Sequence, residues 1–78
     1  MSSQNWRKVF PNMTRKQENA IVLKVTRKLM KFTKKQLADL TGISQRHISK
    51  MESGKLSISE DNAKKMAVAM NTDYRLFL

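Results

Sequence analysis

A pattern that starts helices occurs three times between residues 32 and 63, and it constrains the fold more than any other feature. Each copy has an apolar residue, then a Ser or Thr, then a second apolar residue four positions after the hydroxyl. Such a hydroxyl accepts a hydrogen bond from the first helical turn, and the apolar pair packs across the helix start. The copies are Phe32-Thr33 with Leu37, Ile43-Ser44 with Ile48, and Ile58-Ser59 with Ala63. We predict three short helices, the first with a capping box completed by Gln36.

A longer helix is predicted before these three. From about Thr14 to Lys31 the chain has neither Gly nor Pro, and its apolar residues recur at helical spacing. They are Ala20, Ile21, Val22, Leu23, Val25, Leu29 and Met30. Gly42 separates the first two short helices and Gly54 follows the second, where left-handed residues commonly end a helix.

The C-terminal part completes an all-α prediction. Ala63, Met66, Ala67 and Met70 recur at i, i+3, i+4 and i+7. A final turn from about Asp73 ends in three apolar residues, 76–78, which form the last core layer, a self-association patch, or both. The methionines at positions 30, 51, 66 and 70 are expected in the core. We expect an all-α fold of five helices, with residues 1–13 as a basic and aromatic arm and residues 14–78 as the domain.

The chain is strongly basic. Its 78 residues include 16 Lys and Arg against 6 Asp and Glu, which gives a formal net charge of +10. A single small domain with this charge favours a polyanionic partner. Contact of a basic helix over residues 24–35 with a membrane surface or an acidic protein is an alternative.

Composition also limits the chemistry. The sequence has no Cys and only His47, so it offers neither a thiol nor a cluster of metal ligands. Most carboxylates are expected in structural places, Glu60 and Asp61 in a first helical turn, and Glu18, Asp39 and Asp73 at helix surfaces or caps. We therefore expect no metal, no cofactor and no enzymatic activity, and His47 is interpreted as an exposed polar residue. Without a long apolar stretch or a signal-peptide pattern, a soluble cytoplasmic protein is expected.

Residues 36–51, QLADLTGISQRHISKM, have the spacing of two helices that cross at a steep angle. Inward positions are occupied by Leu37, Ile43, Ile48 and Met51. Ala38 is small where the helices approach closely, and Gly42 lies at the turn. The second helix then presents Gln45, Arg46, Ser49 and Lys50 outward. Arg and Lys bind guanine O6 and N7, and Gln binds adenine N6 and N7, so this face predicts contact with base edges in DNA.

Residues 32–56, FTKKQLADLTGISQRHISKMESGKL, resemble the central stretch of the phage-repressor and Cro-like helix-turn-helix family. The shared marks are Gln-Leu-Ala, the Gly-Ile-Ser turn, Ile-Ser and the closing Glu-Ser-Gly-Lys, within a resemblance over about residues 20–78. It implies a five-helix, lambda-repressor-like domain whose helix beginning at Ser44 enters the major groove. Thr26 and Lys31 depart from the family, which commonly has an apolar residue and a Gly there.

The resemblance also implies roles for individual residues. Base reading is implied for Gln45, Arg46, Ser49 and Lys50. Phosphate contact is implied for Thr33, Lys34, Lys35, Ser44, Ser53 and Lys55. A structural ion pair is implied between Arg27 in the first helix and Glu52 at the end of the recognition helix.

These features predict a sequence-specific DNA-binding transcription regulator, of the Cro-like repressor or restriction-modification controller type. We expect it to bind double-stranded DNA at a palindromic operator as a homodimer. One alternative is the DNA-binding antitoxin of a toxin-antitoxin pair, with a toxin as protein partner. Another is a nonspecific binder that charge alone holds on its partner.

The N-terminal arm allows three interpretations. In the first, Trp6, Val9 and Phe10 pack against the body of the protein or a dimer partner. In the second, the arm lies along DNA through Arg7 and Lys8. In the third, it is disordered.

Overall fold

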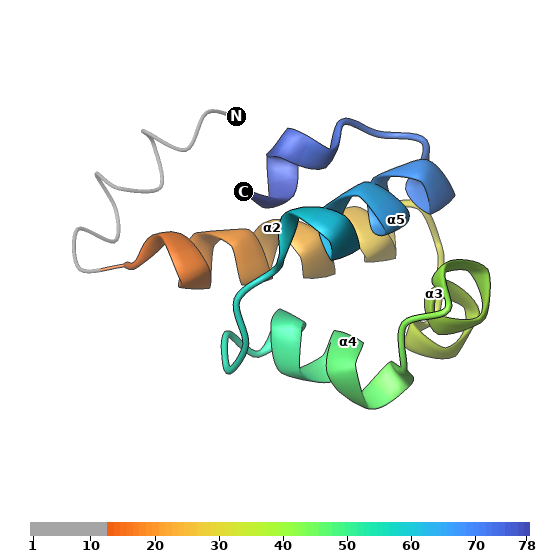
Figure 1. The fold of residues 1–78 in the computed structure, drawn as a ribbon, viewed down its shortest axis with the longest axis horizontal. Helices are drawn as coiled ribbons and strands as arrows, with labels where there is room; N and C mark the ends of the chain where they lie inside the picture. Colours follow the sequence, from red (N-terminus) through yellow and green to blue (C-terminus); the bar gives the residue numbers. More distant parts are fainter. Residues whose placement is uncertain (1–12) are drawn as a thin grey trace.

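The computed structural model describes residues 13–78, and within this range the fold consists of helices without strands. The helices are α2 (Arg15–Leu29), α3 (Lys34–Thr41), α4 (Gln45–Glu52) and α5 (Glu60–Met70), followed by the 3₁₀ turn η1 (Tyr74–Phe77) (Figure 1). The all-α prediction is confirmed here, but the count of five helices is not supported. Asn71 ends α5 in a left-handed conformation, and Asp73 then caps a turn of only four residues. The interpretations of the arm lie outside the described residues.

The three predicted helix starts are confirmed. The capping residues are Thr33, Ser44 and Ser59, and each hydroxyl accepts from the N–H three residues later at 3.0–3.2 Å. Gln36 completes the predicted capping box by accepting from the Thr33 N–H at 2.9 Å. Thr14 and Gln17 form a second capping box at the start of α2. The repeated pattern did not indicate this box, because Glu18 stands where the other copies have an apolar residue.

Left-handed residues lie at the helix ends. Gly42 (φ 76°) and Gly54 (φ 77°) follow α3 and α4, as predicted. Lys31 (φ 62°) and Asn71 (φ 52°) are the non-glycine residues with positive φ in the described range. The Lys31 N–H donates to the Lys28 carbonyl at 3.0 Å, and α2 ends at Leu29, two residues earlier than expected.

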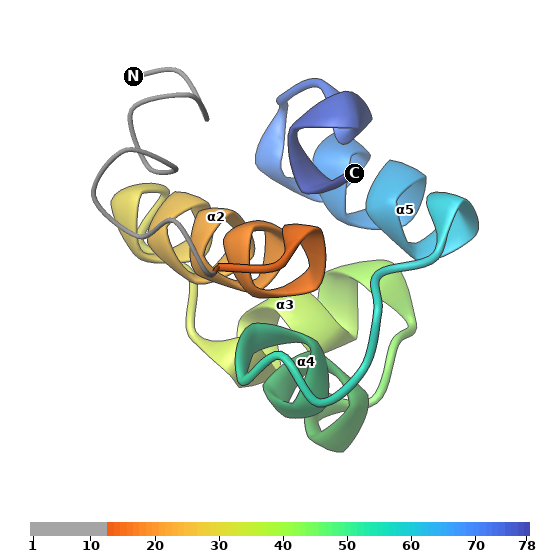
Figure 2. The ribbon, with the colours of Figure 1, turned by 90° about the vertical axis from the view of Figure 1, so that its left-hand side faces the viewer.

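The core lies where the four helices and η1 meet, and Figure 2 shows α3 and α4 on one side of α2, with α5 and η1 on the other. Its fully buried side chains come from every element and are Leu23, Leu37, Ile48, Met51, Ala63, Met66, Met70 and Phe77. Ile43 and Ile58 are also buried, and Phe32 packs against the cluster, so the apolar pairs flank the caps as predicted. Of the C-terminal residues, Phe77 belongs to the core whereas Leu76 is exposed.

Two expectations for α2 are wrong. Met30 is 45% exposed and does not fill the core, because it caps the C-terminal end of α2, beyond the buried turns. Glu18 is buried, at 5% exposure, although it was expected at the helix surface. It lies 3.9 Å from the Arg15 guanidinium, which also donates to the Leu78 carbonyl, so the C-terminal end of the chain approaches this turn of α2.

Candidate nucleic-acid interface

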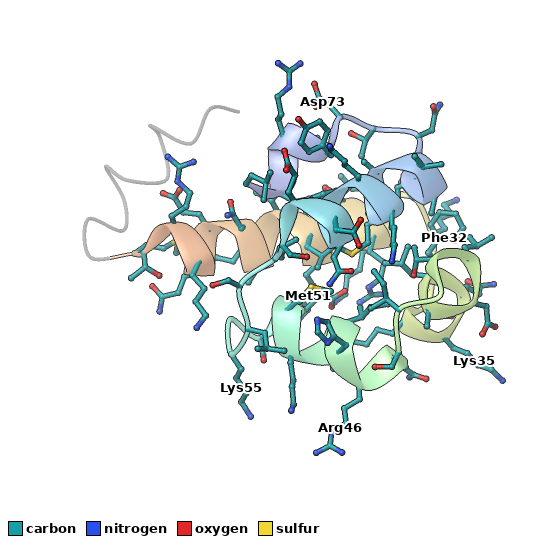
Figure 3. All side chains as sticks on the ribbon, viewed as in Figure 1. Phe32, Lys35, Arg46, Met51, Lys55 and Asp73 are labelled. Atoms are coloured by element: carbon teal, nitrogen blue, oxygen red, sulfur yellow. The ribbon has the colours of Figure 1, made fainter. Side chains whose placement is uncertain are left out.

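Helix α4 turns one side to the core and the other to solvent. Ile48 and Met51 are fully buried and fix the rotation of α4 about its axis. Of the predicted base-reading residues, Gln45, Arg46 and Lys50 are exposed and Ser49 is half-buried. Arg46 points away from the body of the domain (Figure 3). The outward side of α4 therefore carries donors and acceptors of the kind that contact base edges.

The turn between α3 and α4 is held by hydrogen bonds as well as by its glycine. The Gly42 N–H donates to the Ala38 carbonyl at 2.9 Å. Thr41 Oγ1 donates to the Leu37 carbonyl at 2.7 Å and accepts from the Ile43 N–H at 3.2 Å. Sequence reasoning did not assign a role to Thr41, whose only signal is a hydroxyl directly before the turn glycine. These two bonds hold the backbone of the turn that connects α3 to α4.

The predicted phosphate-contacting residues flank α4. Thr33, Lys35, Ser44, Ser53 and Lys55 are exposed and Lys34 is half-buried. Lys35 from α3 and Lys55 from the loop after α4 lie on the same side of the molecule as Arg46 (Figure 3). The hydroxyls of Thr33 and Ser44 accept capping bonds, but each can still donate to a phosphate oxygen.

This side of the domain keeps its positive charge unneutralised. We call the exposed residues Lys35, Arg46, Lys50 and Lys55 the basic face; none of them forms an ion pair within residues 13–78. Helix α5 differs, because Lys64 and Lys65 lie 3.9 and 3.3 Å from the carboxylates of Glu60 and Asp61. The basic face therefore presents positive charge that can attract a polyanion, whereas these two cations of α5 are already paired.

Arg27 and Glu52 are brought together beneath the basic face. Arg27 Nε donates to Glu52 Oε2 at 2.6 Å, and Nη2 donates to Oε1 at 3.1 Å. Both side chains are buried, at 8% and 3% exposure. The two parallel bonds join α2 to the end of α4.

His47 is half-buried and not the exposed residue expected from the sequence. Its Nε2 lies 3.4 Å from Asn62 Nδ2 in the first turn of α5. The contact arises because the first turn of α5, which includes Asn62, lies near α4, a tertiary relation that local spacing does not reveal. With neutral Nε2 as acceptor, the amide donates to the imidazole and links α4 to α5.

Helices α3 and α4 are joined by a short turn that hydrogen bonds hold in place. The outward side of α4 carries basic side chains that form no ion pair within residues 13–78. A family model described as helix-turn-helix matches residues 23–77. The chain belongs to this helix-turn-helix family. The match agrees with the resemblance to phage repressors and Cro-like proteins, and it supports a DNA-binding transcription regulator in general. No curated protein matches the chain in sequence.

Two other features are absent from residues 13–78. This range holds no group of three or more His, Cys, Asp or Glu that could bind a metal ion. None of its helices has the length and apolar character needed to cross a membrane.

Proposed function

We propose that this helix-turn-helix protein is a sequence-specific regulator of the Cro-like repressor or restriction-modification controller type, acting on cytoplasmic DNA. The observation that carries the proposal is the basic face, whose four cations lack acidic partners in the described chain and are centred on α4. Gln45, Arg46, Ser49 and Lys50 would read bases, while the flanking hydroxyls and lysines would bind phosphates.

We infer that the protein binds its operator as a two-fold dimer. A helix of eight residues contacts few base pairs, so one copy provides little discrimination. Two copies related by a two-fold axis would read inverted half-sites about one helical turn apart, roughly 34 Å. The exposed Leu76 beside the buried Phe77 offers apolar surface for such an association.

Selection of duplexes from a random library tests this function. The purified full chain is incubated with the library at about 150 mM salt, where nonspecific binding is weak. We expect a recovered consensus with two inverted halves. The Arg46→Ala variant is selected in parallel and should lose the preference at one or two positions of each half.

Failure to recover a consensus would contradict a specific regulator acting alone. Affinity that falls equally for all sequences as salt rises would then favour the nonspecific binder. Recovery of a consensus only after addition of a co-purified small protein would favour the antitoxin alternative. A consensus of a single, unrepeated half would exclude the dimer but keep the DNA-reading role of α4.

A further inference from the structure

His47 lies at the edge of the outward side of α4. At about 100° per residue, it is about 60° around the helix from Lys50 of the basic face and about 40° from the buried Met51. This position explains why the side chain of His47 is half-buried. His47 therefore borders both the core and the side of α4 that carries the predicted base-reading residues.

The two ring nitrogens of His47 have different surroundings. Nε2 lies 3.4 Å from Asn62 Nδ2 of α5. Nδ1 forms no hydrogen bond within residues 13–78, and it does not belong to the buried polar atoms of this range that lack a partner. Nε2 is thus engaged with a neighbouring helix, whereas solvent reaches Nδ1.

The contact with Asn62 decides where the single proton of a neutral imidazole resides. An amide nitrogen donates hydrogen bonds and has no lone pair with which to accept one. It can bond to Nε2 only when Nε2 carries no proton, so the proton of the neutral ring is then on Nδ1. The solvent-accessible nitrogen of His47 is consequently a hydrogen-bond donor.

A donor at this position matches the backbone of DNA better than its bases. With α4 in the major groove and Arg46 directed at the bases, residues at the edges of its outward side approach the phosphates. Phosphate oxygens accept hydrogen bonds, so they fit an Nδ1 that carries the proton. An Nδ1 without the proton would instead direct its lone pair at the negative charge.

We propose that His47 is a further DNA contact of α4, which donates from Nδ1 to a phosphate oxygen, and that Asn62 is a positioning residue that keeps the proton on Nδ1. The phosphate contact rests on the DNA-binding function proposed above. The basic face supplies charge to the interface, whereas His47 supplies a neutral hydrogen bond. Its orientation is set from α5, outside the two helices of the helix-turn-helix.

The position of the proton is measured in the free protein, because His47 is the single histidine of the chain. The NMR chemical shifts of its two ring nitrogens distinguish the tautomers at about pH 8.5, where an ordinary imidazole is neutral. In a chain without a histidine tag we expect the Nδ1–H form, and in Asn62→Ala a shift toward the Nε2–H form. Asp61→Ala is the matched control, since it changes the same turn of α5 and keeps the amide beside Nε2.

DNA titrations at the same pH test the phosphate contact separately. His47→Ala should weaken operator and scrambled duplexes alike, by about two- to tenfold for one lost hydrogen bond. The slope of log K against log salt should not change, because no charge is removed. His47→Asn should restore most of the affinity, since its amide nitrogen, like Nδ1, is bonded to Cγ. Circular dichroism establishes that each variant stays helical.

The double variant His47→Ala with Asn62→Ala shows whether Asn62 acts through His47. Asn62→Ala alone should cause part of the loss seen in His47→Ala, and it should add nothing once His47 is absent. An additional loss in the double variant would give Asn62 a separate role and overturn its assignment as a positioning residue.

Other results would overturn each half of the proposal. The Nε2–H form in the wild type, or an unchanged tautomer in Asn62→Ala, would refute the role of Asn62. A loss confined to the operator would place His47 on a base, and the absence of any loss in His47→Ala would remove the contact. A wild-type chain that bound no duplex would refute the proposed function and the phosphate contact together, while the tautomer of the free protein would still decide the role of Asn62.

Discussion

Arg27 of α2 donates two hydrogen bonds to Glu52 at the end of α4 and a third to a backbone carbonyl between α2 and α3. Its Nε and Nη2 donate to the two carboxylate oxygens at 2.6 and 3.1 Å. Its Nη1 donates to the Phe32 carbonyl at 2.7 Å. One buried guanidinium thus connects α2, the segment between α2 and α3, and the end of α4.

The first prediction is that Arg27→Ala destabilises the domain by about 3–5 kcal/mol, because Glu52 is left buried without its countercharge. Urea unfolding at neutral pH measures the change. The double variant Arg27→Met with Glu52→Leu should recover much of the loss, since no buried charge remains. Lys65→Ala is the comparison, because it breaks the exposed pair with Asp61 and should cost about 1 kcal/mol or less. If Arg27→Ala cost no more than that, a structural role for the Arg27–Glu52 pair would be refuted.

The second prediction is that Lys31→Gly stabilises the protein by about 1 kcal/mol. Lys31 has φ 62°, a left-handed conformation that costs a residue with a Cβ roughly 1–2 kcal/mol. Glycine avoids this cost, but it also raises the conformational entropy of the unfolded chain, which offsets part of the gain. The Lys31 and Phe32 N–H groups keep their bonds to the Lys28 and Arg27 carbonyls. Thermal unfolding measures the shift.

Gly42→Ala is the matched control for Lys31→Gly. Gly42 has φ 76°, and a Cβ built on it meets no atom within 4 Å, so the substitution adds conformational strain without a clash. We expect a loss of about 1 kcal/mol, opposite in sign to the effect at Lys31. Changes of equal sign at both positions would show that side-chain contacts, not backbone conformation, decide stability there.

The third prediction concerns acid stability. Asp73 accepts hydrogen bonds from the Arg75 side chain and from the Arg75 N–H. These bonds, the side-chain ones most strongly, lower the pKa of Asp73 from 3.8 to about 2. Because the pKa is lower in the folded state, this contribution is present above about pH 3.8 and is lost as pH falls through about 2. Asp73→Asn keeps a capping oxygen but removes the charge, so its unfolding midpoint should depend less on pH between these values.

Arg75→Gln provides the second arm of the acid test, because it removes the main cause of the lowered pKa. It should flatten the same part of the stability curve, and more so at low ionic strength, since the pair is exposed. If both variants follow the wild-type slope, the Asp73–Arg75 pair does not persist in solution.

Local features account for the part of the fold that the sequence predicted. Thr33, Ser44 and Ser59 bond to N–H groups three residues away, so their caps depend on the adjacent chain alone. The heptad-like spacing of residues 63–70 likewise requires only that a helix form. The same reasoning predicted that Gln45, Arg46 and Lys50 are exposed, because the buried Ile48 and Met51 fix the rotation of that helix.

Tertiary relations explain what the sequence did not predict. The apolar residues of α2 cover more than one side, and only its neighbours decide that Leu23 is buried while Leu29 is exposed. Likewise, the approach of the C-terminal end near Glu18 and the contact between His47 and Asn62 join segments far apart in sequence. The roles of the base-reading and phosphate-contacting residues remain predictions, which require DNA to test.

The fourth prediction separates base reading from phosphate contact. Arg46→Ala should cost about 1–3 kcal/mol on the selected operator and much less on unrelated DNA, because it removes contacts to one or two bases. Lys35→Ala should weaken all sequences about equally and reduce the slope of log K against log salt by about 1. Titrations of operator and scrambled duplexes at several salt concentrations measure both effects.

Lys65→Ala is the charge-matched control for Lys35→Ala. It removes the same charge from α5, where Lys65 already lies 3.3 Å from Asp61, so the salt slope should stay near that of the wild type. If Arg46→Ala and Lys35→Ala lowered affinity for every duplex in the same proportion, α4 would contribute charge without base recognition. If Lys65→Ala reduced the slope as much as Lys35→Ala, the polyanion would not be confined to the basic face, and net charge would account for binding.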